Sequence, residues 1–139
     1  MTRINVDKEI AAGRAMLAKL PGAVDFAVVG SAAYCQKPHD VDFVVLVASR
    51  SRLADLAKAL CGSGWRDCGA YGIGGRVGDC WHTVRRGNLN LILTDSRRFF
   101  DGFVLSTEVC KVLRLESRED RVAVHDVVRD RKPASEVRP

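Results

Sequence analysis

The chain has 139 residues, of which 47% are apolar and 28% are charged, and its formal net charge is +5. This composition is that of a folded globular protein rather than a disordered one, and no apolar run approaches the roughly 20 residues that cross a bilayer. The five cysteines form no tight disulfide framework and the N-terminus lacks the plan of a signal peptide, so we expect a cytoplasmic protein without a membrane partner. The modest positive charge permits an anionic ligand such as a nucleotide or RNA without requiring one.

Apolar periodicity and turn residues together predict a series of helices and strands. The first half of the chain should form a helix over 6–20 capped by Asn5, a strand over 26–29, a brief helical turn over 32–34, a strand over 41–48, and a helix from Ser49 or Ser51 to 62. The second half should form a strand over 65–68, a glycine-rich loop over 69–78, and a hairpin of strands over 77–84 and 89–94 around 86–88. Helices should follow beyond 96, with Phe99 and Phe103 on a core face, and the last helix should begin at Ser117.

The order of these elements indicates an α/β fold. We expect a small mixed sheet of four or five strands flanked by helices, with a pair of helices at the C-terminus. Residues 1–131 should form a single domain, and residues 132–139, which are polar and contain two prolines, should form a loose tail.

Two carboxylates, Asp40 and Asp42, flank the first residue of the strand over 41–48. Residues two apart on a strand project from the same face, so these side chains should lie together. Two neighbouring carboxylates make an oxygen-rich site suited to Mg²⁺ or Mn²⁺, and such an ion can hold the phosphates of a nucleotide. The pair therefore predicts a metal site, although Asp-x-Asp on a surface strand is often only a solvated edge.

Ten residues before the carboxylates, Gly30 and Ser31 end the preceding strand. Glycine lets a backbone approach a phosphate closely, and the free amide groups at the start of a helical turn favour anions. The Ser31 hydroxyl could donate a further hydrogen bond to a phosphate. Alone, a Gly-Ser pair after a strand is usually a turn, but its combination with the two carboxylates predicts a site for nucleotide and metal.

Residues 28–47, VVGSAAYCQKPHDVDFVVLV, resemble the minimal nucleotidyltransferases of the DNA polymerase beta superfamily. The resemblance matches Gly30 and Ser31 to the glycine-serine motif and Asp40 and Asp42 to the metal-binding acidic pair, and it extends over about two thirds of the chain. More loosely, residues 107–111 and 117–121 look like segments of phage-encoded members.

The resemblance implies a third carboxylate on a later strand, where this chain has Asn90. An amide oxygen is a neutral and weaker ligand for a hard cation. Asn90 could ligate weakly, Asp79 or Asp95 could take the role, or the site could bind a nucleotide without transferring it. The basic pairs 85–86 and 97–98 could hold a triphosphate or a polynucleotide, although such pairs usually face solvent.

The function that follows from the resemblance is metal-dependent transfer of a nucleoside monophosphate from a nucleoside triphosphate such as ATP to a hydroxyl group. The acceptor could be RNA, a protein or a small molecule. Asp40 and Asp42 would bind the metal, Gly30 and Ser31 would contact phosphates, and Asn90 would assist. The alternative is a non-catalytic scaffold that binds nucleotide, nucleic acid or a partner protein, which the absence of the third carboxylate favours.

Overall fold

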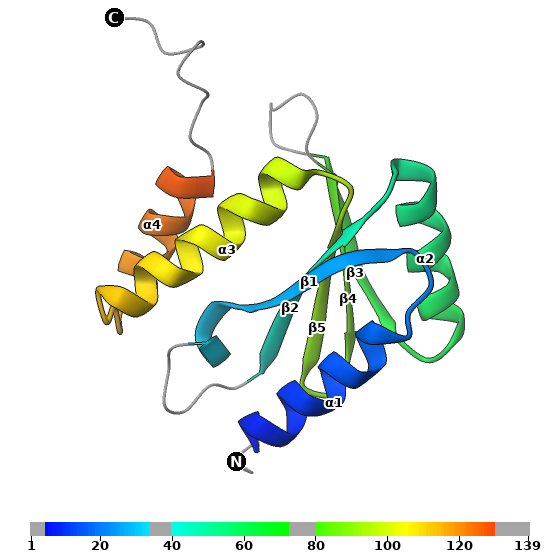
Figure 1. Ribbon diagram of the computed structural model, residues 1–139, viewed down its shortest axis with the longest axis horizontal. Helices are drawn as coiled ribbons and strands as arrows, with labels where there is room; N and C mark the ends of the chain where they lie inside the picture. Colours follow the sequence, from blue (N-terminus) through cyan, green and yellow to red (C-terminus); the bar gives the residue numbers. More distant parts are fainter. Residues whose placement is uncertain (1–4, 34–39, 73–79, 130–139) are drawn as a thin grey trace, which may run out of the picture.

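A computed structural model describes residues 5–33, 40–72 and 80–129 (Figure 1). The elements follow the chain as α1 (Val6–Ala18), β1 (Ala23–Val29), the 3₁₀ helix η1 (Gly30–Ala33), β2 (Val41–Val47), α2 (Arg50–Gly62), β3 (Arg66–Gly72), β4 (Cys80–Arg86), β5 (Leu89–Thr94), α3 (Arg97–Val112) and α4 (Arg118–Arg129).

The five strands form one mixed sheet in the order β1-β2-β5-β4-β3. β2 and β5 are parallel, and the other neighbouring pairs are antiparallel. Asp42 lies opposite Asn90 across the parallel pair. Because the hydrogen-bonded register places paired residues side by side, the sheet brings two segments distant in sequence to one point.

Helices cover both faces of the sheet (Figure 1). One face packs against α1 and α2 through a core that includes Phe43, Val45 and Leu91. The opposite face packs against α3, where Val44 and Phe99 belong to a second, smaller cluster. The alternation of side chains along β2 therefore supplies both cores, which explains why this strand reads as continuously apolar after Asp42.

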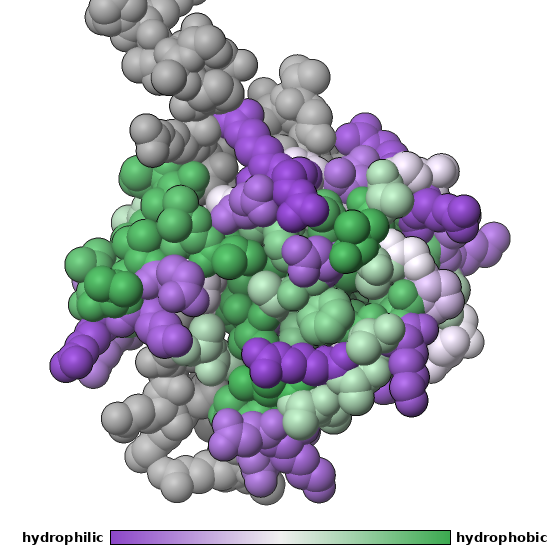
Figure 2. All heavy atoms as spheres, viewed as in Figure 1, coloured by the Kyte–Doolittle hydropathy of each residue, from purple (hydrophilic) through white to green (hydrophobic). Residues whose placement is uncertain are grey.

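The C-terminal helix α4 packs on α3 rather than on the sheet. Large apolar side chains remain exposed on this helix pair and beside it, and Figure 2 shows apolar surface gathered over the same part of the molecule. The exposed apolar residues of this region are Leu105, Val112, Leu113, Val122 and Val127. Within the described ranges, no helix is both long and apolar enough to span a bilayer.

The predicted α/β class, the mixed sheet and the C-terminal helices are confirmed. The helix caps are also confirmed, since Asn5 accepts a hydrogen bond from the Lys8 amide at 3.1 Å, and Ser49 accepts one from the Arg52 amide at 3.3 Å. Ser117 accepts a hydrogen bond from the Asp120 amide at 3.4 Å.

Two expectations about strands were wrong. The strand predicted over 26–29 is longer, because β1 begins at Ala23 and forms one edge of the sheet, where Val24 and Asp25 are exposed. The glycine-rich loop begins later than predicted, because β3 continues to Gly72 by pairing with β4 across a register shift between Asp67 and Ala70. The remainder of that loop, 73–79, and the predicted tail, 132–139, lie outside the described residues.

Candidate functional site

Four polar side chains form a row across four neighbouring strands. Arg66 of β3 lies opposite Arg85 of β4, Arg85 lies opposite Asn90 of β5, and Asn90 lies opposite Asp42 of β2. Residues paired in this way project from one face of the sheet. The row lies on the face that carries α3, and Asp40 stands two residues before Asp42 at the start of β2.

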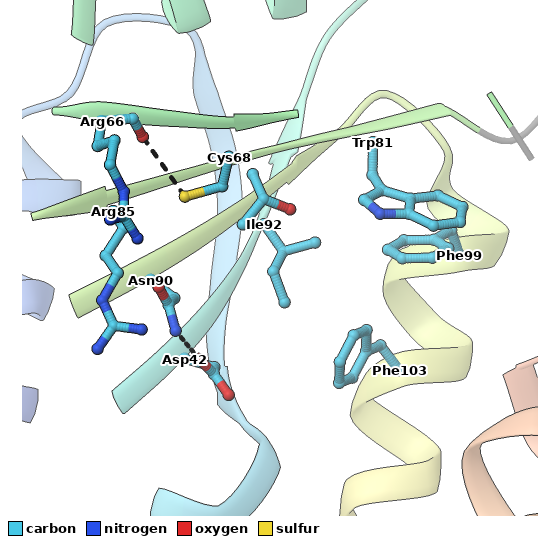
Figure 3. Close-up of a pocket in the computed structure, with 10 residues that line it drawn as sticks. Asp42, Arg66, Cys68, Trp81, Arg85, Asn90, Ile92, Phe99 and Phe103 are labelled. Atoms are coloured by element: carbon cyan, nitrogen blue, oxygen red, sulfur yellow. Dashed lines mark hydrogen bonds between the residues drawn. The ribbon is translucent and has the colours of Figure 1, made fainter. Parts of the chain in front are cut away.

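The two carboxylates and Asn90 are in direct contact. The Asn90 amide Nδ2 donates to Asp42 Oδ1 at 2.8 Å and to Asp40 Oδ2 at 3.1 Å (Figure 3 shows the bond to Asp42). A backbone hydrogen bond from Val41 to Asn88, at 2.8 Å, ties the start of β2 to the hairpin turn. An assisting role for Asn90 requires that it share a face of the sheet with both carboxylates, and the geometry meets this requirement.

Asp42 is the most strongly perturbed acid of the site. Burial raises the pKa of its carboxyl from 3.8 to about 6 and is the largest influence. The Asn90 hydrogen bond lowers this pKa, the negative charge of Asp40 raises it, and the positive charge of Arg85 lowers it. The site thus holds an ionised Asp42 at a free-energy cost that a bound cation would relieve.

Gly30 packs directly behind Asp42. Its φ of +70° lies in the left-handed region, and a Cβ added there would stand 2.7 Å from Asp42 Oδ2. Glycine is therefore required both by the backbone conformation and by the position of the carboxylate. The sequence predicted close approach of this backbone to a phosphate, whereas in this structure the close neighbour of Gly30 is Asp42.

The other residues predicted to assist the site are Ser31, Asp79 and Asp95. The Ser31 backbone belongs to η1, but its side chain lies outside the described part of the molecule, and so does Asp79. The suggestion that Asp95 replaces the third carboxylate is wrong. Asp95 follows the far end of β5, about 16 Å along the strand from Asn90, and there it pairs with Arg50 at 3.5 Å.

The basic pair at 85–86 divides between the two faces of the sheet. Arg85 Nη1 lies 3.5 Å from Asp40 Oδ2, and its Nε donates to the Gly87 carbonyl oxygen at 3.0 Å. Arg86 points to the opposite face, where its guanidinium lies 4.6 Å from the centre of the Trp65 ring. The sequence predicts this hairpin with its turn around 86–88, and the observed register, with a two-residue turn, pairs Arg85 with Asn90 and so places Arg85 in the site.

A cavity of about 320 Å³ opens beside Asp42 and Asn90 (Figure 3). Arg66 and Arg85 line one side of it, and aromatic side chains from β4 and α3 line the other. The cavity exists because α3 covers β1, β2 and β5 while leaving the neighbouring part of the sheet uncovered. Arg66 and the aromatic side were not foreseen as parts of a site, because only tertiary packing brings α3 to this face.

The donor set fits one hard divalent cation. Mg²⁺ is commonly bound by one or two carboxylates, with water and substrate phosphates completing its shell, and Asp40 and Asp42 supply that pair. Asn90 now presents its nitrogen, so its amide must rotate to offer the oxygen to a cation. Within 5–33, 40–72 and 80–129, no group of three or more His, Cys, Asp or Glu side chains could hold a metal.

Comparison with known proteins places the fold among nucleotidyltransferase-like structures. No family model and no curated protein matches the chain. Among solved structures, the conserved protein GrpB from Enterococcus faecalis aligns with a TM-score of 0.52 and 13% identity over 90% of this chain and 92% of that one. A mutant of the Cid1 poly(U) polymerase bound to MgATP aligns with a TM-score of 0.50 and 16% identity over 88% of this chain and 42% of that one.

At these identities the likeness concerns the fold alone. The chain spans about two fifths of the length of the Cid1 polymerase and nearly the whole of the GrpB protein. The looser resemblance to phage-encoded proteins finds no support in these comparisons.

Proposed function

We propose that the chain binds a divalent cation together with a nucleoside triphosphate at Asp40 and Asp42, and transfers the nucleoside monophosphate to a hydroxyl group. The contact of both carboxylates with Asn90, on a parallel strand of a nucleotidyltransferase-like sheet, is the observation that carries this proposal. The Gly-Ser motif and the acidic pair noted in the sequence support it further.

The transfer exchanges one bond to phosphorus for another. The acceptor oxygen bonds to the α-phosphorus, the bond from that phosphorus to the bridging oxygen breaks, pyrophosphate leaves, and the hydroxyl proton passes to water. When bound, the cation supplies charge neutralisation for the phosphates. Asp40 and Asp42 hold it, Gly30 keeps the space behind Asp42 free, and Arg85 adds a positive charge beside the site.

The position of Asn90 favours a second candidate, a scaffold that binds nucleotide without transferring it. The Asn90 amide nitrogen holds both carboxylates, and Arg85 approaches Asp40, so groups of the protein itself partly neutralise the pair. A two-metal transfer reaction uses a second cation, and the neutral Asn90 amide supplies no negative charge to hold it. Binding without turnover is the outcome that this arrangement would produce.

Transfer is tested with nucleoside triphosphates labelled at the α-phosphorus, supplied with Mg²⁺ or Mn²⁺ and with RNA, protein or small hydroxyl compounds as acceptors. The Asp42→Asn variant is compared with Asp55→Asn, which changes an exposed carboxylate on α2. We expect label transfer by the wild type and by Asp55→Asn, and none by Asp42→Asn. Triphosphate binding that depends on Asp42 without any transfer would identify the scaffold, and binding independent of Asp42 would overturn the proposal.

A further inference from the structure

The cavity beside Asp42 has two chemically different sides, which face each other in Figure 3. The basic wall consists of Arg66 and Arg85. The aromatic wall consists of Trp81, Phe99 and Phe103. A volume of about 320 Å³ suits one small ligand or one residue of a polymer.

The basic wall places two like charges directly opposite each other, since Arg66 and Arg85 are paired residues of β3 and β4. Such a pair destabilises a sheet unless an anion lies between or beside the charges. Arg85 has Asp40 as a partner, but no carboxylate of the described residues forms an ion pair with Arg66. The wall is therefore suited to an anionic group of a ligand, and guanidinium groups bind phosphate through paired hydrogen bonds.

The aromatic wall is held in place by packing. Trp81 stacks on Phe99 with ring centres 4.8 Å apart and an angle of 14° between the planes, and Phe103 meets Phe99 edge-on at 5.8 Å. Side chains fixed in this way lose little conformational freedom when a ligand binds. They offer apolar and aromatic contact to a planar ring.

The two walls and Asp42 mark three corners of the cavity. The backbones of Trp81 and Arg85 are about 13 Å apart along β4, and the backbone of Asp42 lies two strands, about 10 Å, from that of Arg85. A ligand that reaches all three corners needs a planar ring, an anionic group and a polar group at separate positions. A nucleoside monophosphate unit has this arrangement in its base, its phosphate and its ribose hydroxyls.

We propose that this cavity binds the acceptor, and that the acceptor is a nucleoside monophosphate unit, supplied either as a free nucleotide or as the 3′-terminal residue of an RNA strand. Its phosphate contacts Arg66 and Arg85, its base contacts the aromatic wall, and a ribose hydroxyl is directed toward Asp42. The orientation of that hydroxyl rests on the proposed transfer function. The binding itself needs no cation, because the basic wall belongs to the protein.

Calorimetric titration with AMP in the absence of divalent cations tests the binding. Arg66→Gln is compared with Arg52→Gln, which removes an exposed arginine from α2 on the other face of the sheet. Loss of a charge-assisted hydrogen bond should weaken AMP binding by about tenfold or more in Arg66→Gln and leave Arg52→Gln unchanged. Phe103→Leu, which keeps an apolar side chain but removes the ring, should also weaken AMP binding, and thermal unfolding confirms that each variant is folded.

A second titration distinguishes the two sources of the ligand. A short oligoadenylate with a free 3′-hydroxyl is compared with the same strand closed by a 3′-phosphate, each in the wild type and in Arg66→Gln. Tighter binding of the open strand than of AMP identifies an RNA end as the acceptor, and binding of AMP alone identifies the free nucleotide. Absence of AMP and strand binding, equal affinities in Arg66→Gln and Arg52→Gln, or displacement of AMP by MgATP would overturn the inference.

These outcomes separate the inference from the proposed function. Arg66-dependent AMP binding without Asp42-dependent triphosphate binding would leave the cavity as a nucleotide site and remove the transfer function. Asp42-dependent triphosphate binding without AMP binding would keep the proposed function and remove the acceptor cavity.

Discussion

Replacement of Asp42 by Asn should stabilise the protein when no divalent cation is present. Burial raises the pKa of Asp42 from 3.8 to about 6, against the lowering effect of the Asn90 hydrogen bond. One pKa unit corresponds to about 1.4 kcal/mol, so the ionised side chain destabilises the folded state by about 3 kcal/mol. Asn has nearly the same shape, carries no charge, and can still accept the hydrogen bond from Asn90.

The effect has a defined dependence on pH. Because the folded-state pKa is raised, the folded protein holds this proton more tightly than the unfolded chain. The stability linked to the proton is fully present below pH 3.8, falls between pH 3.8 and about 6, and stays low at higher pH. The neighbouring charged groups, Asp40 and Arg85, are unchanged in the variant, so the difference between the two proteins isolates Asp42.

Urea unfolding of the wild type and of Asp42→Asn, measured from about pH 4 to about pH 8, checks this expectation. The variant should be more stable by up to about 3 kcal/mol at the upper end, and the two curves should converge toward pH 4. Asp55→Asn serves as the exposed control and should follow the wild type. A less stable Asp42→Asn variant, or a difference that does not change with pH, would refute the argument that burial strains this carboxylate.

Two further substitutions test the site, and a third tests the core on the opposite face of the sheet. Gly30→Ala should lower the free energy of unfolding, measured in urea, by about 1–3 kcal/mol, because φ is +70° and the new Cβ would meet Asp42. If adding Asp42→Ala to this variant recovers none of the loss, the clash is excluded. Asn90→Asp should lower the melting temperature without cations, since a donor to two carboxylates becomes a third negative charge. The same variant should bind Mn²⁺ at least about tenfold more tightly, and an unchanged Mn²⁺ affinity in a calorimetric titration would contradict the metal site. Gly13→Ala should lower the free energy of unfolding by about 1–3 kcal/mol, although alanine favours a helix more than glycine does, because the Phe43 ring fills the space where the new Cβ would lie. A higher melting temperature would show that the Phe43 ring moves aside at little cost.

The sequence was sufficient for the elements whose signals are local. Helix caps at Asn5 and Ser49 and the apolar run of β2 depend on residues within one turn or one strand, and the structure confirms them. The meeting of Asp42 with Asn90 was also predictable, although they are far apart in sequence. The contact follows if β5, the second strand of the hairpin, forms a parallel pair with β2, the strand at the acidic motif.

The rest depends on tertiary packing that no local pattern records. β3 extends through Gly69 because β4 offers a partner across a register shift, although a glycine-rich segment predicts a loop. Phe99 and Phe103 were expected to form core, and the sequence cannot tell that α3 leaves part of the sheet uncovered, so that both also line a cavity. No local pattern marks Arg66 as a site residue, because its neighbour Arg85 lies on another strand.

Binding of Mn²⁺ together with a non-hydrolysable nucleoside triphosphate, followed by electron paramagnetic resonance, tests the central claim most directly. Free Mn²⁺ gives a strong signal that is lost on binding, so the affinity of the site can be measured without any acceptor or turnover. We predict that the wild type and Asp55→Asn bind Mn²⁺ with the triphosphate and that Asp42→Asn binds at least about tenfold more weakly, the effect of losing one charged ligand. Equal Mn²⁺ affinity in wild type and Asp42→Asn would contradict the assignment of Asp40 and Asp42 as a cation and nucleotide site.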